Sequence, residues 1–202
     1  METSLLFGIA TFAFITSVTP GPNNMMLLAS GAQFGFARTL PHMFGIVFGV
    51  AMLLLSVLLG LGVIFSLYPM MYSILNVAGG IYLLWLAFKI ATGPVSAIQN
   101  DAQENSHPLT WWQAALFQFV NPKAWMMALG SVSTFSLPGK EYAFSGAMIM
   151  LAFAVIGFPS ISIWAGTGAK LRVLLNNPRR QRIFNLIMGA LTAATLLLII
   201  EI

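Results

Sequence analysis

Long apolar stretches separated by short polar intervals run along the whole chain. Each stretch has about the 20 residues that a helix needs to cross a bilayer. The clearest are 43–65 and 183–200, which contain no charged residue. The pattern predicts six transmembrane helices, over residues 4–29, 39–65, 70–91, 112–135, 142–164 and 183–200. The short-range alternation of apolar and polar positions that marks membrane β-barrels is absent from the sequence.

The composition places the chain in a membrane. Of its 202 residues, 58% are hydrophobic and only 7% are charged, whereas a soluble domain carries about 25% charged residues. We therefore predict an all-α integral membrane protein surrounded mainly by lipid. The chain has no cysteine, which excludes disulfides and thiolate metal sites. We predict neither a metal nor a cofactor.

Lysine and arginine fall mainly on one side of the predicted topology. Six spans put both termini on the same side of the membrane. With the N-terminus outside, only Lys140 is on the outer side and Lys123 is within a span. The cytoplasmic basic residues are Arg38, Lys89, Lys170, Arg172, Arg179, Arg180 and Arg182. The positive-inside rule therefore predicts periplasmic termini. We interpret the cluster at 177–182 as a topogenic loop facing lipid, and predict no nucleic-acid binding.

The chain divides into two related halves, 1–92 and 111–202, separated by a polar linker at 93–110. Thr-Pro-Gly-Pro-Asn-Asn at 19–24 interrupts the first predicted helix, and Asn-Pro-Lys at 121–123 interrupts the fourth. Three helices per half is an odd number, so the second half would enter the membrane inverted, as in many secondary transporters. The sequence thus predicts a single transmembrane domain of two inverted three-helix repeats. Two independently kinked helices are the alternative.

The first break contains more than a kink requires. A proline inside a helix removes one hydrogen bond and clashes with the preceding turn. In a membrane the freed backbone groups persist only where protein or water surrounds them. Pro20, Gly21 and Pro22 are followed at once by Asn23 and Asn24, which add side-chain donors and acceptors. We interpret the segment as a local opening of the helix that faces a cavity. A structural kink capped by asparagine is the alternative.

Lys123 lies about midway along the fourth predicted span. A lysine at that depth costs about 2.5–3.5 kcal/mol on insertion scales, and intramembrane cations usually face a polar pathway or a partner. No carboxylate falls inside any predicted span. A bound carboxylate of a small molecule would supply the missing anion. The alternative is a lysine satisfied by backbone carbonyls at the Pro122 break.

The absence of intramembrane carboxylates also limits the mechanism. Many ion-coupled carriers use Asp or Glu inside the membrane. If transport here is coupled to protons, the candidate titrating groups are Lys123 and His42, near the start of the second predicted helix. An interfacial residue is the alternative for His42, and transport driven by the substrate gradient needs no titrating group.

The residues that an enzyme or an ATP-driven pump would need are missing from the sequence. Two histidines at predicted loop positions and no buried carboxylate provide no catalytic set, so we do not expect an enzyme. The sequence contains no Gly-x-x-x-x-Gly-Lys-Ser/Thr loop, so a primary pump would need another subunit.

Small and aromatic residues predict how the helices pack. Gly31 and Gly35 form one four-residue step and Gly45 and Gly49 another. This spacing lets transmembrane backbones approach each other, within the monomer or, as the alternative, in a homodimer. Four aromatic residues fall near predicted interfaces, where they are typical membrane anchors. They are Trp111, Trp112, Tyr142 and Trp164.

These motifs resemble the lysine exporter/homoserine–threonine exporter superfamily, in the same order and over essentially the whole chain. The similar segments are 19–24 with the four glycines that follow, Gly-Ile-Tyr-Leu-Leu-Trp-Leu-Ala-Phe-Lys at 80–89, and Phe-Val-Asn-Pro-Lys at 119–123. The resemblance implies a secondary transporter in the bacterial inner membrane that exports amino acids or small derivatives without ATP hydrolysis. The cysteine/O-acetylserine and neutral amino-acid exporters are the most similar subgroup.

The resemblance also implies where the substrate binds. The candidate substrate-binding residues are Pro20, Gly21, Pro22, Asn23, Asn24, Asn121, Pro122 and Lys123. We expect the two breaks to meet near the midplane, with Lys123 and a helix N-terminus holding the substrate carboxylate. Asn23, Asn24 and exposed carbonyls would hold the ammonium, and the halves would alternate access between the two sides. A channel or a non-transporting membrane scaffold is the rival interpretation.

Overall fold

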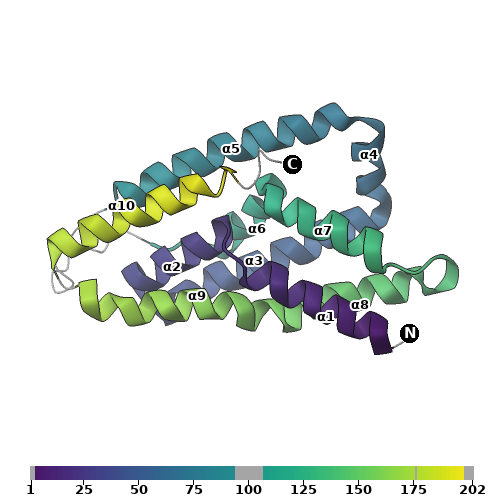
Figure 1. Ribbon diagram of the computed structural model, residues 1–202, viewed down its shortest axis with the longest axis horizontal. Coiled ribbons are helices and arrows are strands. Elements are labelled where there is room, and N and C mark those ends of the chain that lie inside the picture. Colours follow the sequence, from purple (N-terminus) through teal and green to yellow (C-terminus); the bar gives the residue numbers. More distant parts are fainter. Residues whose placement is uncertain (1–2, 94–106, 176, 198–202) are drawn as a thin grey trace.

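The computed structural model describes residues 3–93, 107–175 and 177–197, and these are almost entirely helical (Figure 1). The α-helices are α1 (Thr3–Val18), α2 (Pro22–Phe34), α3 (Phe36–Ser56), α4 (Gly62–Leu67), α5 (Pro69–Ala91), α6 (Trp111–Val120), α7 (Pro122–Phe135), α8 (Tyr142–Val155), α9 (Gly157–Leu171) and α10 (Pro178–Ala194). A π-helical turn, Val57–Leu61, joins α3 to α4. Short 3-10 turns precede α8 and follow α9, at Gly139–Glu141 and Arg172–Leu175. The prediction of an all-α protein is confirmed for the described residues.

Three stretches are long and apolar enough to cross a membrane, namely Phe36–Ile64, Ser73–Ala91 and Gly139–Leu175. The pair α1 and α2, bent by 56° at their junction, makes a fourth if it counts as one span. α6 and α7 have only 10 and 14 residues, and the 17 residues of α10 begin with Pro-Arg-Arg-Gln-Arg. By length and composition the structure therefore supports three or four spans, and six remain a prediction.

Several predicted helices are interrupted. The helix predicted over 4–29 breaks after Val18 and resumes up to Phe34. The helix predicted over 39–65 contains the π-helical turn, where Gly60 has a φ of 104°. The helix predicted over 142–164 is interrupted at Ile156, because Pro159 has no N–H to bond the Val155 carbonyl. Most of the predicted linker, 94–106, lies outside the described residues.

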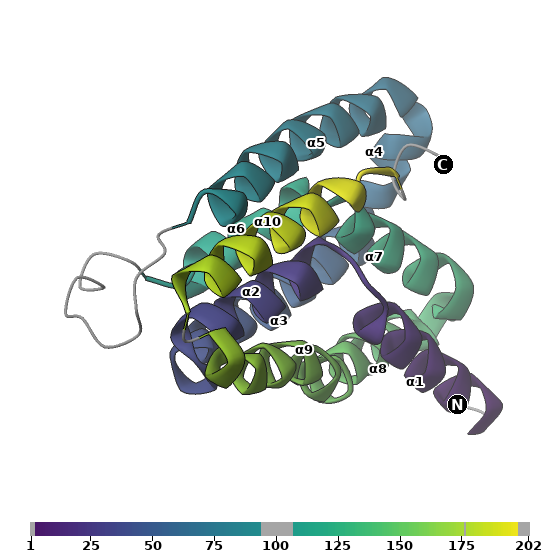
Figure 2. The ribbon, with the colours of Figure 1, turned by 60° about the vertical axis from the view of Figure 1, so that its left-hand side comes forward.

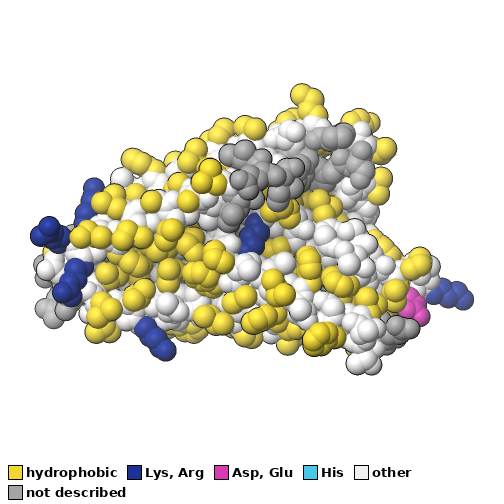
Figure 3. Space-filling view, viewed as in Figure 1, with side chains coloured by type: hydrophobic (Ala, Val, Ile, Leu, Met, Phe, Trp, Pro, Cys, Tyr) yellow, Lys and Arg dark blue, Asp and Glu magenta, His cyan; other side chains and the backbone are white. Residues whose placement is uncertain are grey.

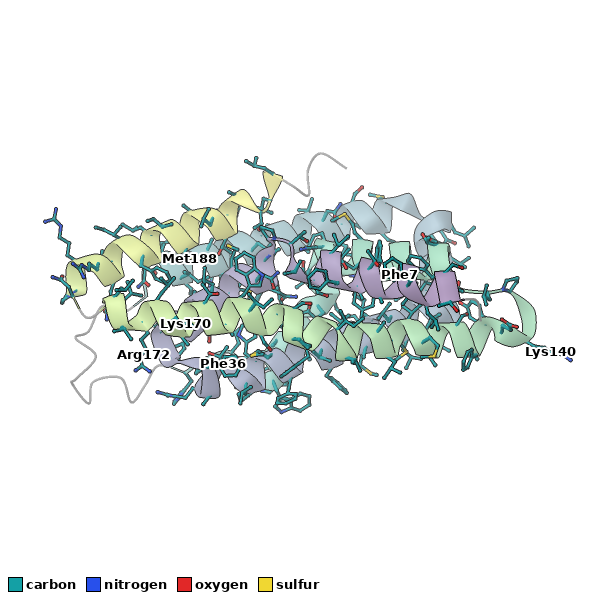
Figure 4. All side chains as sticks on the ribbon, turned by 60° about the horizontal axis from the view of Figure 1, so that its bottom comes forward. Phe7, Phe36, Lys140, Lys170, Arg172 and Met188 are labelled. Atoms are coloured by element: carbon teal, nitrogen blue, oxygen red, sulfur yellow. The ribbon has the colours of Figure 1, made fainter. Side chains whose placement is uncertain are left out.

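The two ends of the elongated molecule differ in charge. Lys and Arg side chains gather at one end in Figure 3. Figure 4 places Lys170 and Arg172 at this end and Lys140 at the opposite end. We call the first the basic end. It comprises the first turns of α3 and α10 and the last turns of α5 and α9, and it carries Arg38, Lys89, Lys170, Arg172, Arg179, Arg180 and Arg182.

Helix crossings in the half of the molecule toward the basic end, at left in Figure 2, bring backbones into direct contact, among them those of α2 with α9 and of α3 with α6. A Cβ on Gly31 of α2 would stand 2.1 Å from the Ala165 carbonyl oxygen of α9, and one on Gly168 would stand 2.1 Å from that of Leu28. α3 meets α6 in the same way. A Cβ on Gly45 or Gly49 would lie 2.1 Å or 2.5 Å from the carbonyl oxygens of Trp111 and Ala115. The prediction of glycine-mediated packing within the monomer is confirmed at Gly31, Gly45 and Gly49.

Gly35 differs from the other predicted packing glycines. It forms the corner between α2 and α3 with a φ of 84°, a backbone conformation that residues other than glycine rarely adopt. The prediction that Gly35 belongs to a backbone packing step is therefore wrong, because Gly35 forms the turn after α2 and a Cβ there would meet the Arg172 side chain, at 3.1 Å from Nη1, and no helix backbone. The homodimer remains a prediction.

Toward the opposite end the helices meet through side chains instead. A Cβ on Gly8 of α1 would lie 3.1 Å from the Phe135 ring of α7, and one on Gly146 of α8 would lie 2.9 Å from Leu58 methyl groups. Phe135 also packs edge-on against Phe12 of α1, with ring centroids 5.6 Å apart. Side chains can change rotamer, whereas a backbone crossing separates only when whole helices move.

Candidate functional site

The break between α1 and α2 leaves five carbonyl groups without their usual helical donors. In an unbroken helix the carbonyls of residues 16–20 would accept from the N–H groups of residues 20–24. Pro20 and Pro22 have no N–H, and the chain is extended at Gly21, with φ 177° and ψ 175°. The Thr16 carbonyl accepts from the Thr19 hydroxyl at 3.2 Å. Unpaired carbonyls in a membrane interior cost several kcal/mol each, so the structure has to supply other donors.

Two side chains supply part of that need. The amide of Asn24 donates to the carbonyls of Ser17 at 2.8 Å and Thr19 at 2.7 Å. The indole of Trp164 in α9 donates to the carbonyl of Val18 at 3.0 Å. The interpretation of Trp164 as a membrane anchor is therefore wrong, because the bend of the first helix brings its broken end against α9. Asn24 is 3% exposed, so its amide serves the break rather than solvent.

Lys123 of α7 completes the set. Its ammonium donates to the Thr19 carbonyl at 2.8 Å, the Thr19 hydroxyl at 3.0 Å and the Pro20 carbonyl at 3.1 Å. The alternative of a lysine bound to backbone carbonyls is thus partly confirmed, but the carbonyls belong to the first break and not to the Pro122 break. All three acceptors are neutral oxygen atoms, so these contacts leave the positive charge of Lys123 unneutralised.

The second break is capped from within its own half. α6 ends at Val120 and α7 begins at Pro122. The Asn121 side chain accepts from the Lys123 backbone N–H at 3.1 Å, which makes it the N-cap of α7. The Trp125 indole donates to the Phe119 carbonyl at 2.8 Å. By contrast, α2 has no side-chain cap, so its N-terminal N–H groups and their partial positive charge face the break.

Gln118 joins the two breaks and was not predicted. Its amide and that of Asn23 exchange hydrogen bonds of 2.8 Å and 3.1 Å, and it also donates to the Ala114 carbonyl at 2.9 Å. The Gln118 side chain is fully buried. The signal in the sequence was a glutamine three residues before Asn121 in an otherwise apolar run. A polar side chain is unfavourable on a helix face that contacts lipid, so it usually faces the protein interior.

A central cavity lies between the breaks. Five of the eight predicted substrate-binding residues line it, namely Gly21, Asn23, Asn24, Asn121 and Lys123. Apolar side chains of α3 and of α8–α9 complete its wall. The three prolines shape the breaks without lining the cavity. Its volume is about 40 Å³, well below the roughly 300–1,000 Å³ of ordinary ligand pockets. The elements around it must move apart before an amino acid can fit.

His42 does not belong to this cavity. It lies in the second turn of α3, is 1% exposed and lines a different cavity toward the basic end. The ring is covered by protein because α3 begins in contact with α2. The alternative of His42 as an interfacial residue stays a prediction. Its coupling role and that of Lys123 remain predictions.

Comparisons with known proteins agree with this architecture. The model of the family described as LysE type translocator matches residues 14–199. The chain is 32% identical over 194 residues to the cysteine/O-acetylserine efflux protein of Escherichia coli (strain K12), covering 95% of each chain. The identity and coverage are the same for the cysteine/O-acetylserine efflux protein of Shigella sonnei (strain Ss046). No solved structure matches the chain.

A multi-pass helical membrane protein is the class that the fold and the comparisons define. The chain belongs to the LysE type translocator family. The resemblance predicted from the sequence is therefore confirmed, and so is the prediction that the chain is a transporter of the bacterial inner membrane and not an enzyme.

Proposed function

We propose that this chain is a secondary transporter that exports small neutral amino acids or close derivatives, of the cysteine and O-acetylserine kind, from the bacterial cytoplasm. The family match spans most of the chain, and the efflux relatives align over 95% of it. The observation that carries the proposal is the ammonium of Lys123, held between two helix breaks beside a cavity, where its hydrogen bonds to described residues all go to neutral oxygen atoms.

The proposed topology has six spans in two inverted halves. The pairs α1–α2 and α6–α7 each serve as one broken span, and α10 begins the last span. In this arrangement 1–92 and 111–202 are the repeats. The basic end lies in the cytoplasm, following the positive-inside rule, and both termini lie in the periplasm. The matching positions of the two breaks support this assignment.

The substrate is proposed to replace the contacts that the breaks now make with each other. Its carboxylate binds the Lys123 ammonium and the uncapped N-terminus of α2, because both are positive. Its ammonium binds the side-chain oxygens of Asn23 and Asn121 and the carbonyl of Thr19, which Lys123 releases. The remaining predicted residues, Pro20, Pro22 and Pro122, keep these groups out of helical hydrogen bonds.

Alternating access is the mechanism that these observations support best. The central cavity is too small for an amino acid, so the halves must separate. Toward the basic end the helices cross backbone to backbone at Gly31 and Gly45, whereas toward the opposite end Phe135 and Leu58 fill the contacts. Opening toward the periplasm would then need side-chain rearrangement, and opening toward the cytoplasm would need movement of α2 and α3 as rigid units.

The test is amino-acid release from cells that express the chain after loading with dipeptides. The medium is analysed over time for the wild type, for Lys123→Ala and for the control Lys140→Ala, which removes an exposed lysine at the opposite end. Release that saturates with internal concentration, is lost in Lys123→Ala and persists in Lys140→Ala supports the proposal. Release that does not saturate and carries a large ionic current would indicate a channel. Normal release by Lys123→Ala would overturn the site.

A further inference from the structure

His42 is a buried polar side chain without a hydrogen-bond partner among the described residues. Both ring nitrogens lack a hydrogen-bond partner among the described residues, and the residue is 1% exposed. A neutral imidazole carries one donor and one acceptor, and leaving them unpaired in an apolar interior is costly. Buried polar groups of this kind call for an explanation, and a ligand that supplies the partners is one.

The ring lines a cavity at the basic end, with a volume of about 470 Å³. This volume lies within the roughly 300–1,000 Å³ usual for small-molecule sites. We call it the basic-end cavity. It lies between α2, α3, the last turn of α5 and the segment that begins at His107. Its polar lining residues among those the structure describes are Ser30, Gln33, His42, Lys89, Thr92 and His107.

The charge of this lining suits an anion. The described lining residues include the lysine Lys89, and no described lining residue is an aspartate or glutamate. The Lys89 ammonium lies 4.5 Å from the centroid of the Trp85 ring, a cation–π contact that orients the side chain without neutralising its charge.

The neighbours of His42 are already committed to other hydrogen bonds. Ser30 and Thr39 pair through their hydroxyls at 2.9 Å, and Thr39 also donates to the Gly35 carbonyl at 2.8 Å. Thr39 lies one turn before His42 on α3. Because these hydroxyls are satisfied by each other and by the backbone, the imidazole is the polar group beside them that is left to bind a ligand.

The basic-end cavity lies next to the central cavity along two shared helices. On α3, His42 lines the first and Ile46 the second, one helical turn apart. On α2, Asn24 lines the central cavity, and Ala29 and Ser30 line the basic-end cavity. One helical turn rises about 5.4 Å, so the two linings lie about that far apart along α3.

We propose that the basic-end cavity is a second binding site for the exported amino acid, occupied before the central cavity, in which Lys89 and His42 hold the substrate carboxylate. This inference rests on the proposed function and extends it by a loading site on the cytoplasmic side. The protonated ring nitrogen of His42 donates to the carboxylate, Lys89 supplies the positive charge, and Gln33 offers its side-chain oxygen to the substrate ammonium.

The test separates the two sites by removing one of them. Purified Lys123→Ala protein, in which the central site is disabled, is heated with L-cysteine, O-acetyl-L-serine or cysteamine, which is cysteine without its carboxylate. The two amino acids should still raise the melting temperature of Lys123→Ala, and cysteamine should not. The double variant Lys123→Ala/His42→Phe should lose this response. Lys123→Ala/Lys170→Ala, the control at an exposed lysine outside the cavity, should keep it.

A second pair of variants separates binding from packing. His42→Phe replaces unpaired nitrogens by carbon of similar shape, which should leave the melting temperature of the substrate-free protein unchanged or higher. The same change should raise the half-saturating internal concentration for efflux about tenfold to a hundredfold, the loss expected for one hydrogen bond to a charged group. His42→Gln keeps a donor and an acceptor and should lose less.

Each outcome bears on the proposal. If the amino acids stabilise the wild type but not Lys123→Ala, the second site is overturned while the proposed function stands. Unchanged half-saturation in His42→Phe, or a lower melting temperature without substrate, likewise overturns it. If cells that express the wild type release neither amino acid and the purified protein binds neither, the proposed function falls and this inference falls with it.

Discussion

The ammonium nitrogen of Lys123 lies 2.8 Å from the carbonyl oxygen of Thr19, which belongs to a residue 104 positions earlier in the chain. The contact joins the two proline breaks directly. The first break exposes carbonyls and has no charge of its own, while the second supplies a cation and caps its own backbone through Asn121. Each break therefore holds what the other lacks, and a zwitterionic amino acid has the two charges needed to replace their contact.

Gly21 should be intolerant of even a methyl group. A Cβ there would lie 2.7 Å from Cδ and 3.0 Å from Nζ of Lys123. Because the lysine side chain is flexible, we expect Gly21→Ala to fold but to displace the ammonium from Thr19. Amino-acid efflux should fall about tenfold to a hundredfold, the effect of losing one charged hydrogen bond of about 1.5–3 kcal/mol. Efflux from dipeptide-loaded cells measures this.

Gly166 is the matched control for Gly21. It lies within α9, and a Cβ at this position would meet no atom within 4 Å. Gly166→Ala should therefore leave efflux unchanged, with a melting temperature equal to or slightly above that of the wild type, because alanine favours a helix more than glycine does. Equal efflux from the Gly21 and Gly166 variants would show that the position of the ammonium does not matter for transport.

The reciprocal amide pair of Asn23 and Gln118 should stabilise the contact between α2 and α6. In a double-mutant cycle, Asn23→Ala and Gln118→Ala should show a coupling of about 0.6–1.7 kcal/mol, the range for hydrogen bonds between transmembrane helices. Unfolding of purified protein without substrate measures the coupling. A parallel cycle with Gln113→Ala, which lies in the same helix but bonds Thr110, should give none. Similar coupling in both cycles would mean that the effect spreads through α6 and does not come from the amide pair.

The sequence predicted the position of both breaks because proline leaves a direct mark. Pro20, Pro22 and Pro122 interrupt apolar runs, and the helices do end beside them. Lys123 was predicted for the same reason, since a cation inside an apolar run is rare. These features are local in the chain, so they can be recognised without knowledge of the fold.

The partners across the breaks could not be predicted. Which donor reaches which carbonyl depends on how the helices cross, and that is set by contacts far apart in sequence. Trp164 was interpreted as an interfacial anchor, yet it bonds Val18, 146 residues away. His42 gave no sign of burial, because it stands between the polar Arg38 and Thr39 and the apolar run that begins at Met43. The number of spans is equally hidden where short helices such as α6 and α7 share one apolar run.

The backbone crossing of α2 and α9 should be a stability determinant. Gly31→Ala would place a Cβ 2.1 Å from a carbonyl oxygen, and neither backbone can yield without separating the helices. Overpacking of this kind costs about 1–3 kcal/mol, and each kcal/mol lowers the melting temperature of a chain of this size by about 2–4 °C. A thermal shift assay in detergent measures the loss. Equal melting temperatures of Gly31→Ala and Gly166→Ala would mean that the two backbones are farther apart than described.

The orientation of the chain in the membrane can be tested by labelling introduced cysteines. Because the chain has no cysteine of its own, a single introduced thiol is the only target for a maleimide. Lys140→Cys and Lys170→Cys place thiols on exposed positions at opposite ends of the molecule. If the basic end is cytoplasmic, a membrane-impermeant maleimide should label Lys140→Cys in intact spheroplasts and Lys170→Cys only after permeabilisation. Efflux of both variants should match the wild type, which shows that each is folded. The reverse labelling pattern would put the basic end in the periplasm, and the basic-end cavity would then receive the amino acid after the central cavity rather than before it.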